Sequence, residues 1–535
     1  MTLERGSFAT VCTTDGTFTF GRIKHGCRRL IWRDSPSFSG IPNVRGCGER
    51  LCVVHLDWVD ATDLADRIRN REIAPREAVE AALTRIDELN GTINAVVTRM
   101  DNAALERADQ GFDLSQPFSG VPFLVKESAP VAGVRASSAS RYLRDNVAER
   151  DSELVTRYRR AGLILIGKTN MPEFGILGTT EPELFGPTRN PWDTSRSAGG
   201  SSGGSAAAVS SGFVSMAHGS DAGGSIRIPA SCCGVVGLKP SRWRLPQVPG
   251  SNVAGLSVEH AITRTVRDSA RLLDATMDRD GTAGFKCPLP QRSFFSAVTR
   301  DPPRLRIAFS GASPLGFNVS GDCIAAVTYT AAQCEALGHD VQEGAPAFEP
   351  VLFNSFDALW MSELAEWIDA DLQRDRGRLL EDDTEPLTRA ILDIGRRRTA
   401  ADFQRGLAGA QIAAARAAEF HETFDVWVTP SLAAPPVPLG WFEQTEDDPL
   451  QAYRRDAEFC AFTPVANMTG QPAISVPLHW NEQGLPIGVH LTGAFGKEDV
   501  LFGLAGQLER AIGWANRHPP TAVTPATSPE TPPNR

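Results

Sequence analysis

The chain has 535 residues, of which 41% are hydrophobic and 22% are charged, and its formal net charge is −10. These values are typical of a soluble globular protein with a large core. The acidic balance argues against a nucleic-acid partner, because such a protein needs a concentrated basic face to meet phosphate charge. The sequence contains no run of about 18 apolar residues and no apolar leader, so we expect no membrane association and a cytoplasmic location.

The N-terminal stretch differs from the rest of the chain. Residues 1–56 follow neither the helical nor the strand period, and we interpret them as an irregular extension ahead of one domain over residues 57–518. Four cysteines fall in this extension, namely Cys12, Cys27, Cys47 and Cys52. A zinc site is one interpretation of that cluster, but no two of them have C-x₂-C spacing, so we expect buried thiols and predict no metal or cofactor.

Helical and extended patterns alternate from residue 57 onwards. Apolar residues at three- and four-residue steps predict a helix over residues 75–89, which Asn90 and Gly91 should end. The other predicted helices are 153–161, 205–214, 324–337 and 500–512, and the predicted strands are 93–97, 121–125, 163–166, 305–309, 426–428, 474–476 and 487–491. This alternation predicts an α/β architecture with a largely buried sheet. The Pro- and Thr-rich tail, residues 519–535, should be disordered.

One segment satisfies a nucleotide-binding pattern. Residues 162–169 read GLILIGKT, which matches the P-loop motif G-x-x-x-x-G-K-[ST]. The four interior positions of that motif are Leu, Ile, Leu and Ile, and branched apolar residues favour a buried strand over a turn that curls round phosphates. We therefore interpret the segment as a core strand and disfavour nucleotide hydrolysis.

Small residues dominate residues 190–240, where two glycine–serine clusters flank the stretch SAAAVSSGFV. A flexible linker is the simplest alternative for such a composition. A linker does not usually enclose a buried helix, however, and glycines let backbone N–H groups approach a substrate closely. We therefore favour an oxyanion hole beside a nucleophile.

The same region also fits the G-x-S-x-G nucleophile elbow, at residues 199–203. The elbow requires a strand that runs into its first glycine, and we expect no strand in residues 192–198. A serine esterase would also need a histidine base, and no motif singles out His421, His479 or His490. This alternative is disfavoured.

The block 190–240, together with Lys126 at the end of GVPFLVKE, resembles the amidase signature family. The segments LILIGKTNMPEFG and NMTGQPAISVPLHWNEQGLPIGVHLTG resemble it too, so the likeness covers roughly residues 57–518. The resemblance implies a large mixed central β-sheet covered by helices on both faces. It also implies hydrolysis of C–N bonds by a serine, a second serine that follows a cis peptide, and a lysine.

The family roles can be carried over residue by residue. The resemblance implies Ser225 as nucleophile, Ser201 as bridging serine and Lys126 as base. The backbone N–H groups of the oxyanion hole would come from Ala222, Gly223, Gly224 and Ser225. The supporting residues would be Ser202, Asp221 and Arg227. Ser220 stands where many members have threonine, which is a conservative change.

This chemistry constrains the lysine. An amide is a poor electrophile with a poor leaving group, so the site must activate a hydroxyl, stabilise an oxyanion and protonate the departing nitrogen. Lysine can act as a base only when neutral, so its ordinary pKa of about 10.4 must fall through burial. The apolar run before Lys126 favours a desolvated position. We hypothesise a proton relay from Ser225 through Ser201 to Lys126 and an acyl-enzyme on Ser225.

The substrate is less sharply indicated. By family position, Phe174, Gly175, Ile176 and Thr179 should face the acyl pocket. Residues 350–460 should close it, and their aromatic residues Phe353, Phe356, Trp360, Trp367, Trp441 and Phe442 are explained either by core packing or by an apolar or aryl pocket.

The overall sequence looks similar to family members that act on small or xenobiotic amides, including cyclic-dimer hydrolases, aryl acylamidases and carbamate-cleaving enzymes. We therefore expect a small-molecule amide or carbamate substrate, and a homodimer is compatible with this class. The rival is a glutaminase-type amidotransferase subunit that works in a complex. A catalytically silent binding protein is disfavoured because Lys126, Ser201 and Ser225 are all present.

Overall fold

The computed structural model describes residues 8–12, 18–22, 56, 58–246, 252–281, 284–348, 352–374 and 383–523. The chain divides into two compact units, Met1–Val53 and Val54–Arg535. In the first unit, β1 (Phe8–Cys12) and β2 (Phe18–Arg22) form an antiparallel ladder. The expectation of an irregular extension is therefore wrong for these two segments, whose β-branched and aromatic residues favour pairing.

The second unit is built on a mixed sheet, which among the described residues has eleven strands. In spatial order they are β12 (Asp340–Glu343), β11 (Arg306–Phe309), β13 (Val426–Pro430), β15 (Pro486–Gly493), β14 (Ala473–Trp480), β9 (Val236–Lys239), β10 (Val258–Thr263), β8 (Met216–Asp221), β4 (Pro122–Lys126), β5 (Ile164–Thr169) and β3 (Val96–Arg99). Strand β4 runs parallel to both of its neighbours, β5 and β8, whereas β10 pairs antiparallel with β8 and β9. A separate two-stranded ladder joins β6 (Arg189–Asn190) and β7 (Asp193–Ser197).

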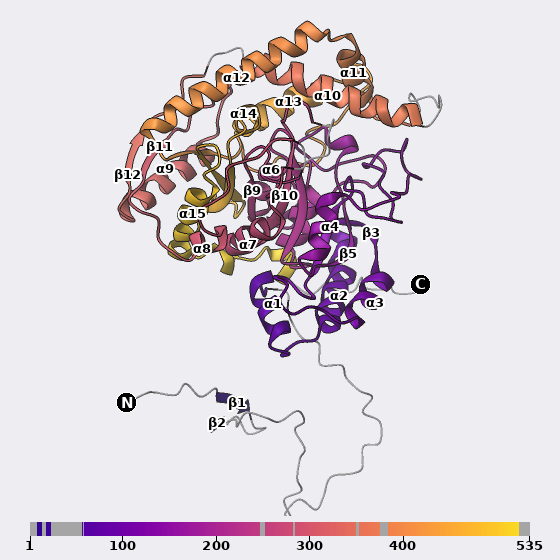
Figure 1. Cartoon of the computed structure of the whole chain (residues 1–535), viewed down its shortest axis with the longest axis vertical. Coiled ribbons are helices and arrows are strands. Elements are labelled where there is room, and N and C mark those ends of the chain that lie inside the picture. Colours follow the sequence, from indigo (N-terminus) through magenta and orange to yellow (C-terminus); the bar gives the residue numbers. More distant parts are fainter. Residues whose placement is uncertain are drawn as a thin grey trace, which may run out of the picture. The chain divides into compact units, whose positions relative to one another are not determined.

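Helices flank this sheet, and Figure 1 shows α10, α11 and α12 grouped together, with α10 packed against both α11 and α12. The α-helices are α1 (Ala61–Arg69), α2 (Pro75–Ile93), α3 (Asp101–Asp109), α4 (Glu153–Arg160), α5 (Gly203–Ser210), α6 (Arg227–Cys233), α7 (Val266–Thr276), α8 (Phe294–Val298), α9 (Gly321–Ala336), α10 (Leu352–Arg374), α11 (Pro386–Arg397), α12 (Ala400–Thr423), α13 (Gln451–Phe459), α14 (Pro464–Thr469), α15 (Glu498–Ile512) and α16 (Pro520–Val523). The described residues also contain two 3₁₀ helices, η1 (Glu173–Gly175) and η2 (Trp514–Asn516). The predicted α/β class and mixed sheet are confirmed.

Both faces of the sheet are buried, as strand β4 illustrates. Phe123 and Val125 join the hydrophobic cluster that contains residues of α7 and α15, whereas Leu124 joins the cluster that contains residues of α5 and α6. Successive side chains of a strand point to opposite faces, so this alternation places helices over both. Lys126 shares the parity of Leu124, which directs its side chain to the face where α5 packs.

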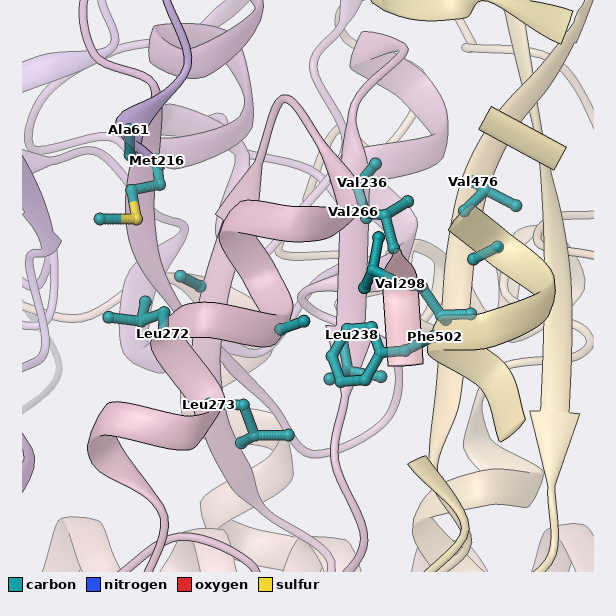
Figure 2. Packing of buried hydrophobic residues seen from close by; sticks show 14 of the residues in the cluster. Ala61, Met216, Val236, Leu238, Val266, Leu272, Leu273, Val298, Val476 and Phe502 are labelled. Carbon is teal, nitrogen blue, oxygen red and sulfur yellow. The ribbon is translucent and has the colours of Figure 1, made fainter. Parts of the chain in front are cut away.

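The larger of these clusters is shown in Figure 2. Val266, Leu272 and Leu273 of α7 belong to it together with Val236 of β9 and Phe502 of α15, and the figure shows Val266 beside Val236. These side chains are 0% exposed, and full burial of each stabilises the fold by about 1.5–3 kcal/mol before entropy is counted. Helices and strands distant in sequence are held together here.

Helix α2 extends beyond its predicted end. The expectation that Asn90 and Gly91 stop the helix is wrong, because the helix continues to Ile93, which is fully buried. The burial of Ile93 outweighs the cost of a glycine inside a helix, about 1 kcal/mol. Asn94 ends the helix in the left-handed region, with φ of 55°, and so the strand predicted for 93–97 starts later, with β3.

The segment with the P-loop pattern is a strand. It forms β5, all six residues of which are buried, and Lys168 donates its Nζ hydrogen bond to the Arg135 carbonyl. The Thr169 hydroxyl contacts Ser205 Oγ at 2.7 Å. The lysine and threonine that would serve a nucleotide are therefore occupied within the core.

The tail begins with a short helix, α16, and the Thr521 hydroxyl donates to the Pro191 carbonyl at 2.6 Å. Disorder is therefore wrong for residues 520–523, and residues 524–535 lie outside the described part of the chain. No helix in that part combines the length and apolar character needed to cross a membrane.

Candidate active site

Lys126 ends strand β4 between β5 and β8, and its side chain is 1% exposed. Burial disfavours the ammonium form and lowers the pKa of Lys126 to about 7, although the negative charges of Asp221 and Glu259 act in the opposite direction. The backbone N–H of Lys126 donates to His218 Nδ1 at 3.3 Å. The lysine is therefore fixed at the strand end and loses its proton near neutral pH.

The Lys126 ammonium contacts two hydroxyls. Its Nζ lies 2.7 Å from Ser201 Oγ and 2.8 Å from Ser220 Oγ. Ser201 follows a cis Gly200–Ser201 peptide bond, as the family resemblance implies, and stands just before α5. Ser220 lies on β8, so the neighbouring strand supplies the second partner.

Ser202 ties these parts together. The Ser202 Oγ donates a hydrogen bond to the Ser220 backbone carbonyl at 3.2 Å. The Ser202 backbone N–H donates to the Ser225 carbonyl at 3.1 Å. The turn that carries Ser201 is therefore held both to β8 and to the segment that carries Ser225.

The segment 222–225, which is the predicted oxyanion loop, connects β8 to α6. Gly224 has φ of +141°, a conformation that favours glycine, and a Cβ there would lie 2.2 Å from Thr463 Oγ1. The Thr463 hydroxyl donates to the Gly223 carbonyl at 2.7 Å. This contact holds the loop in shape, and Gly223 and Ser225 line a cavity.

Asp221 and Arg227 form a fully buried ion pair at the base of this loop. Arg227 Nε and Nη2 donate to the two carboxylate oxygens at 2.9 and 2.8 Å. Burial alone would raise the pKa of Asp221, but the guanidinium outweighs it and holds that pKa well below its usual range. The Asn467 side chain accepts a hydrogen bond from Arg227 and donates one to Asp221, so both charged groups have further hydrogen bonds. The pair joins the start of α6 to the end of β8.

The predicted pocket residues divide into two groups. Gly175 and Ile176 line the cavity of about 560 Å³, counted with the open space at its mouth, that Ser225 also lines. Phe174 and Thr179 do not line it. Phe174 packs edge-on against Trp367, and the buried Thr179 hydroxyl bonds Glu181 and Ser197.

The aromatic residues of 350–460 divide in the same way. Phe356 and Trp360 line the cavity, where their rings stack. Trp441 and Phe442 do not line it and pack against each other and Phe459. The side chain of Phe353 lies outside the described residues. Core packing and pocket lining therefore each account for part of this set.

A strand does precede the G-x-S-x-G sequence. The expectation of no strand in 192–198 is wrong, because β7 ends at Ser197 and α5 begins at Gly203. Among the described residues β7 pairs with β6 in the small ladder and, through Arg196, with Pro438, but it is not part of the central sheet, and the amine that contacts Ser201 is that of Lys126. Among the described residues no group of three metal-ligating side chains converges. The side chains of the four N-terminal cysteines lie outside those residues.

A family model described as Amidase matches residues 77–502, well over half of the chain. The chain belongs to the amidase signature family. It is therefore an amidohydrolase that acts on carbon–nitrogen bonds other than peptide bonds, with small amides as its substrates.

Two relatives and one solved structure show how far the likeness extends. The 6-aminohexanoate-cyclic-dimer hydrolase of Paenarthrobacter ureafaciens is 35% identical, with 86% of this chain and 96% of that protein covered. The acylamidase of Rhodococcus erythropolis is 32% identical, with 88% and 99% covered. A solved 6-aminohexanoate cyclic dimer hydrolase in complex with substrate has a TM-score of 0.83 at 34% identity, with 87% and 99% covered.

Sequence reasoning missed several residues of this amidase site. Thr463 and Asn467 hold the loop 222–225 and the Asp221–Arg227 pair, and Asp456 lines the cavity. Their signals in the sequence are weak, since Thr463 and Asn467 are isolated polar residues in an apolar stretch and Asp456 is one charge in the run RRDAE. They belong to the site because the fold brings them into contact with residues that lie more than 200 positions earlier in the chain.

Proposed function

We propose that this amidase hydrolyses small or xenobiotic amides, including cyclic amides, anilides and carbamates, with Ser225 as nucleophile, Ser201 as bridge and Lys126 as base. The observation that carries the proposal is the 2.7 Å contact of Lys126 Nζ with Ser201 Oγ inside a buried site. A lysine whose pKa is about 7 is neutral often enough at physiological pH to accept a proton.

The proposed reaction begins with proton transfer. Lys126 accepts the Ser201 hydroxyl proton while Ser201 accepts that of Ser225, whose Oγ bonds to the carbonyl carbon. The resulting oxyanion would be stabilised by backbone N–H groups of residues 222–225. When the C–N bond breaks, the proton returns through Ser201 to the leaving nitrogen. Water then hydrolyses the Ser225 ester by the same relay.

The cavity beside Ser225 supports a substrate with apolar parts. Its walls include Leu177, Ile228, Leu315 and Pro464, with the rings of Phe356 and Trp360 on one side. Apolar walls with a few polar groups suit a small organic amide. The similarity to proteins named cyclic-dimer hydrolase and acylamidase supports the same substrate class.

A glutaminase subunit of an amidotransferase remains the rival function. It would need a cation to bind the carboxylate of glutamine and a partner subunit for full activity. Among the described residues that line the cavity, the ionisable groups are Asp456, Tyr453 and Cys460, and none of them is a cation at neutral pH. The lining therefore favours the hydrolase.

The test is a panel of p-nitroanilides, linear and cyclic amides and aryl carbamates, supplied to the isolated chain. We expect turnover of at least one class without a partner protein, and a loss of about 10³-fold or more in kcat for Ser225→Ala, because the nucleophile is gone. Mass spectrometry of the quenched reaction should find the acyl group on Ser225.

The matched control is Ser195→Ala, which removes an exposed hydroxyl from β7 without touching the cavity. Its kcat should stay near that of the unaltered chain. Turnover that survives Ser225→Ala, or an acyl label on another side chain, would contradict the proposed nucleophile. A chain that is inactive alone but releases ammonia from glutamine with a partner would favour the rival function.

A further inference from the structure

Asp456 lies in the wall of the cavity that Ser225 also lines. It stands on α13, and its Oδ1 accepts the Gly178 backbone N–H at 2.7 Å and the Cys460 thiol at 3.5 Å. A Cβ at position 178 would lie only 2.5 Å from Oδ1, so the close approach depends on the glycine. The carboxyl group is therefore held in a fixed place.

Asp456 lines the cavity, and its second carboxyl oxygen accepts no hydrogen bond from a described residue. Among the described residues both hydrogen bonds of Asp456 go to Oδ1, and no lysine, arginine or histidine forms an ion pair with the group. Burial raises the pKa of Asp456 to about 6, with the hydrogen bonds from Gly178 and Cys460 acting in the opposite direction. At pH 8 the group is thus a carboxylate without a cationic partner, a costly arrangement unless a ligand supplies one.

Aromatic rings line the same cavity as this carboxylate. Trp360 stacks on Phe356 at 6.3 Å and on Tyr453 at 5.6 Å between ring centroids, and all three line the cavity. Tyr453 precedes Asp456 by three residues on α13, which puts both on one face of the helix. Ring faces attract cations, so a carboxylate with aromatic neighbours suits an ammonium group.

The carboxylate also lies a short way from the nucleophile loop. A Cβ built on Gly224 would lie 2.7 Å from Ile228 Cδ1, and one built on Gly178 would lie 3.5 Å from the same atom. One isoleucine side chain therefore separates the loop of Ser225 from the glycine that contacts Asp456. A substrate that reaches both needs a short apolar spacer.

We propose that Asp456 is a specificity-determining residue that binds a protonated amino group, which the substrate carries on a short aliphatic or aryl spacer beyond the scissile amide. This proposal rests on the proposed function, because its kinetic test requires hydrolysis at Ser225. Its binding test is independent of turnover.

The kinetic test compares two substrates of the same shape, 6-aminohexanoyl p-nitroanilide and heptanoyl p-nitroanilide, at pH 8. Asp456→Asn keeps the size and the acceptor for Gly178 but removes the charge. We expect the ratio of kcat/KM, amino over methyl substrate, to fall about tenfold or more. The control Glu458→Gln removes the same charge from an exposed position of α13 and should leave the ratio unchanged.

The binding test uses hexylamine and 1-hexanol with the unaltered chain, measured by titration calorimetry at pH 8. Hexylamine should bind about tenfold or more tightly than 1-hexanol, and Asp456→Asn should remove that preference. Equal binding of the two probes by the unaltered chain overturns the proposal, even where Asp456→Asn fails to fold. An unchanged kinetic ratio in a folded Asp456→Asn also overturns it. Hexylamine preference in a chain without amidase activity would support the proposal and reject the proposed function.

Discussion

Three buried lysines of this chain differ in the groups that their amines contact. Burial lowers the pKa of Lys126 and Lys239 to about 7 and that of Lys168 to about 8. Lys168 and Lys239 donate to backbone carbonyls, which have no proton to give up. Lys126 contacts the hydroxyls of Ser201 and Ser220. Among these three lysines the contact with hydroxyls is what supports Lys126 as the proposed base.

The pH dependence of activity follows from Lys126. The proposed base must be neutral, so kcat/KM should rise as pH increases through about 7 and level off above pH 8. Lys126→Arg should lower kcat/KM by about 10²–10⁴-fold at every pH, because a guanidinium keeps its proton. The measurement is kcat/KM for an uncharged p-nitroanilide from pH 5.5 to 9.5, with thermal unfolding followed at each pH as the control. A flat profile, or an arginine variant with full activity, would be incompatible with Lys126 as base.

Helix α5 depends on glycine for its place against the sheet. All eight of its residues are buried, and Gly204 donates its backbone N–H to the Asn170 carbonyl at 3.2 Å. A Cβ at position 204 would lie 2.4 Å from Asn170 N and 2.7 Å from the Ala95 carbonyl oxygen. Both atoms belong to the backbone, which cannot relieve the overlap by changing rotamer as a side chain can. The start of this helix places Ser201 beside Lys126.

We therefore expect Gly204→Ala to destabilise the protein by about 1–3 kcal/mol, as overpacking does, and to lower kcat/KM by displacing Ser201. Gly91→Ala is the matched control, since a Cβ at this helical position in α2 meets nothing within 4 Å. It should stabilise the protein by about 0.5–1 kcal/mol. Urea denaturation measures both free energies of unfolding. Similar values for the two variants would reject the packing argument.

The site draws on most of the second compact unit. Lys126 comes from β4, Ser201 from the turn before α5, Ser225 from the loop after β8, and Asp456 from α13. The first turn of α1 is anchored as well, since the backbone N–H groups of Ala61 and Thr62 both donate to the Asp268 carboxylate at 2.8 Å. The unit Val54–Arg535 contains all of these groups.

We expect a chain that begins at Val54 to keep its kcat/KM and its Tm, because the proposed domain starts after the N-terminal unit. A chain that begins at Asp66 should have a lower Tm, because it lacks the two N–H groups that satisfy the buried Asp268 carboxylate. Enzyme assays and thermal unfolding of both chains measure these effects. A chain starting at Val54 that fails to fold would refute the proposed division.

The sequence by itself determined the α/β class and the strands 121–125 and 163–166, because an uninterrupted apolar run specifies burial on both sides of a strand. Through the family resemblance it also pointed to Lys126, Ser201 and Ser225, of which the first two are in contact. Only the tertiary structure decided that β4 lies between β5 and β8, and that Asp456 reaches the cavity. The physical reason is that a local pattern of apolar residues indicates whether a side chain is buried. It does not indicate which other part of the chain covers that side chain, because this depends on packing between segments that lie hundreds of residues apart.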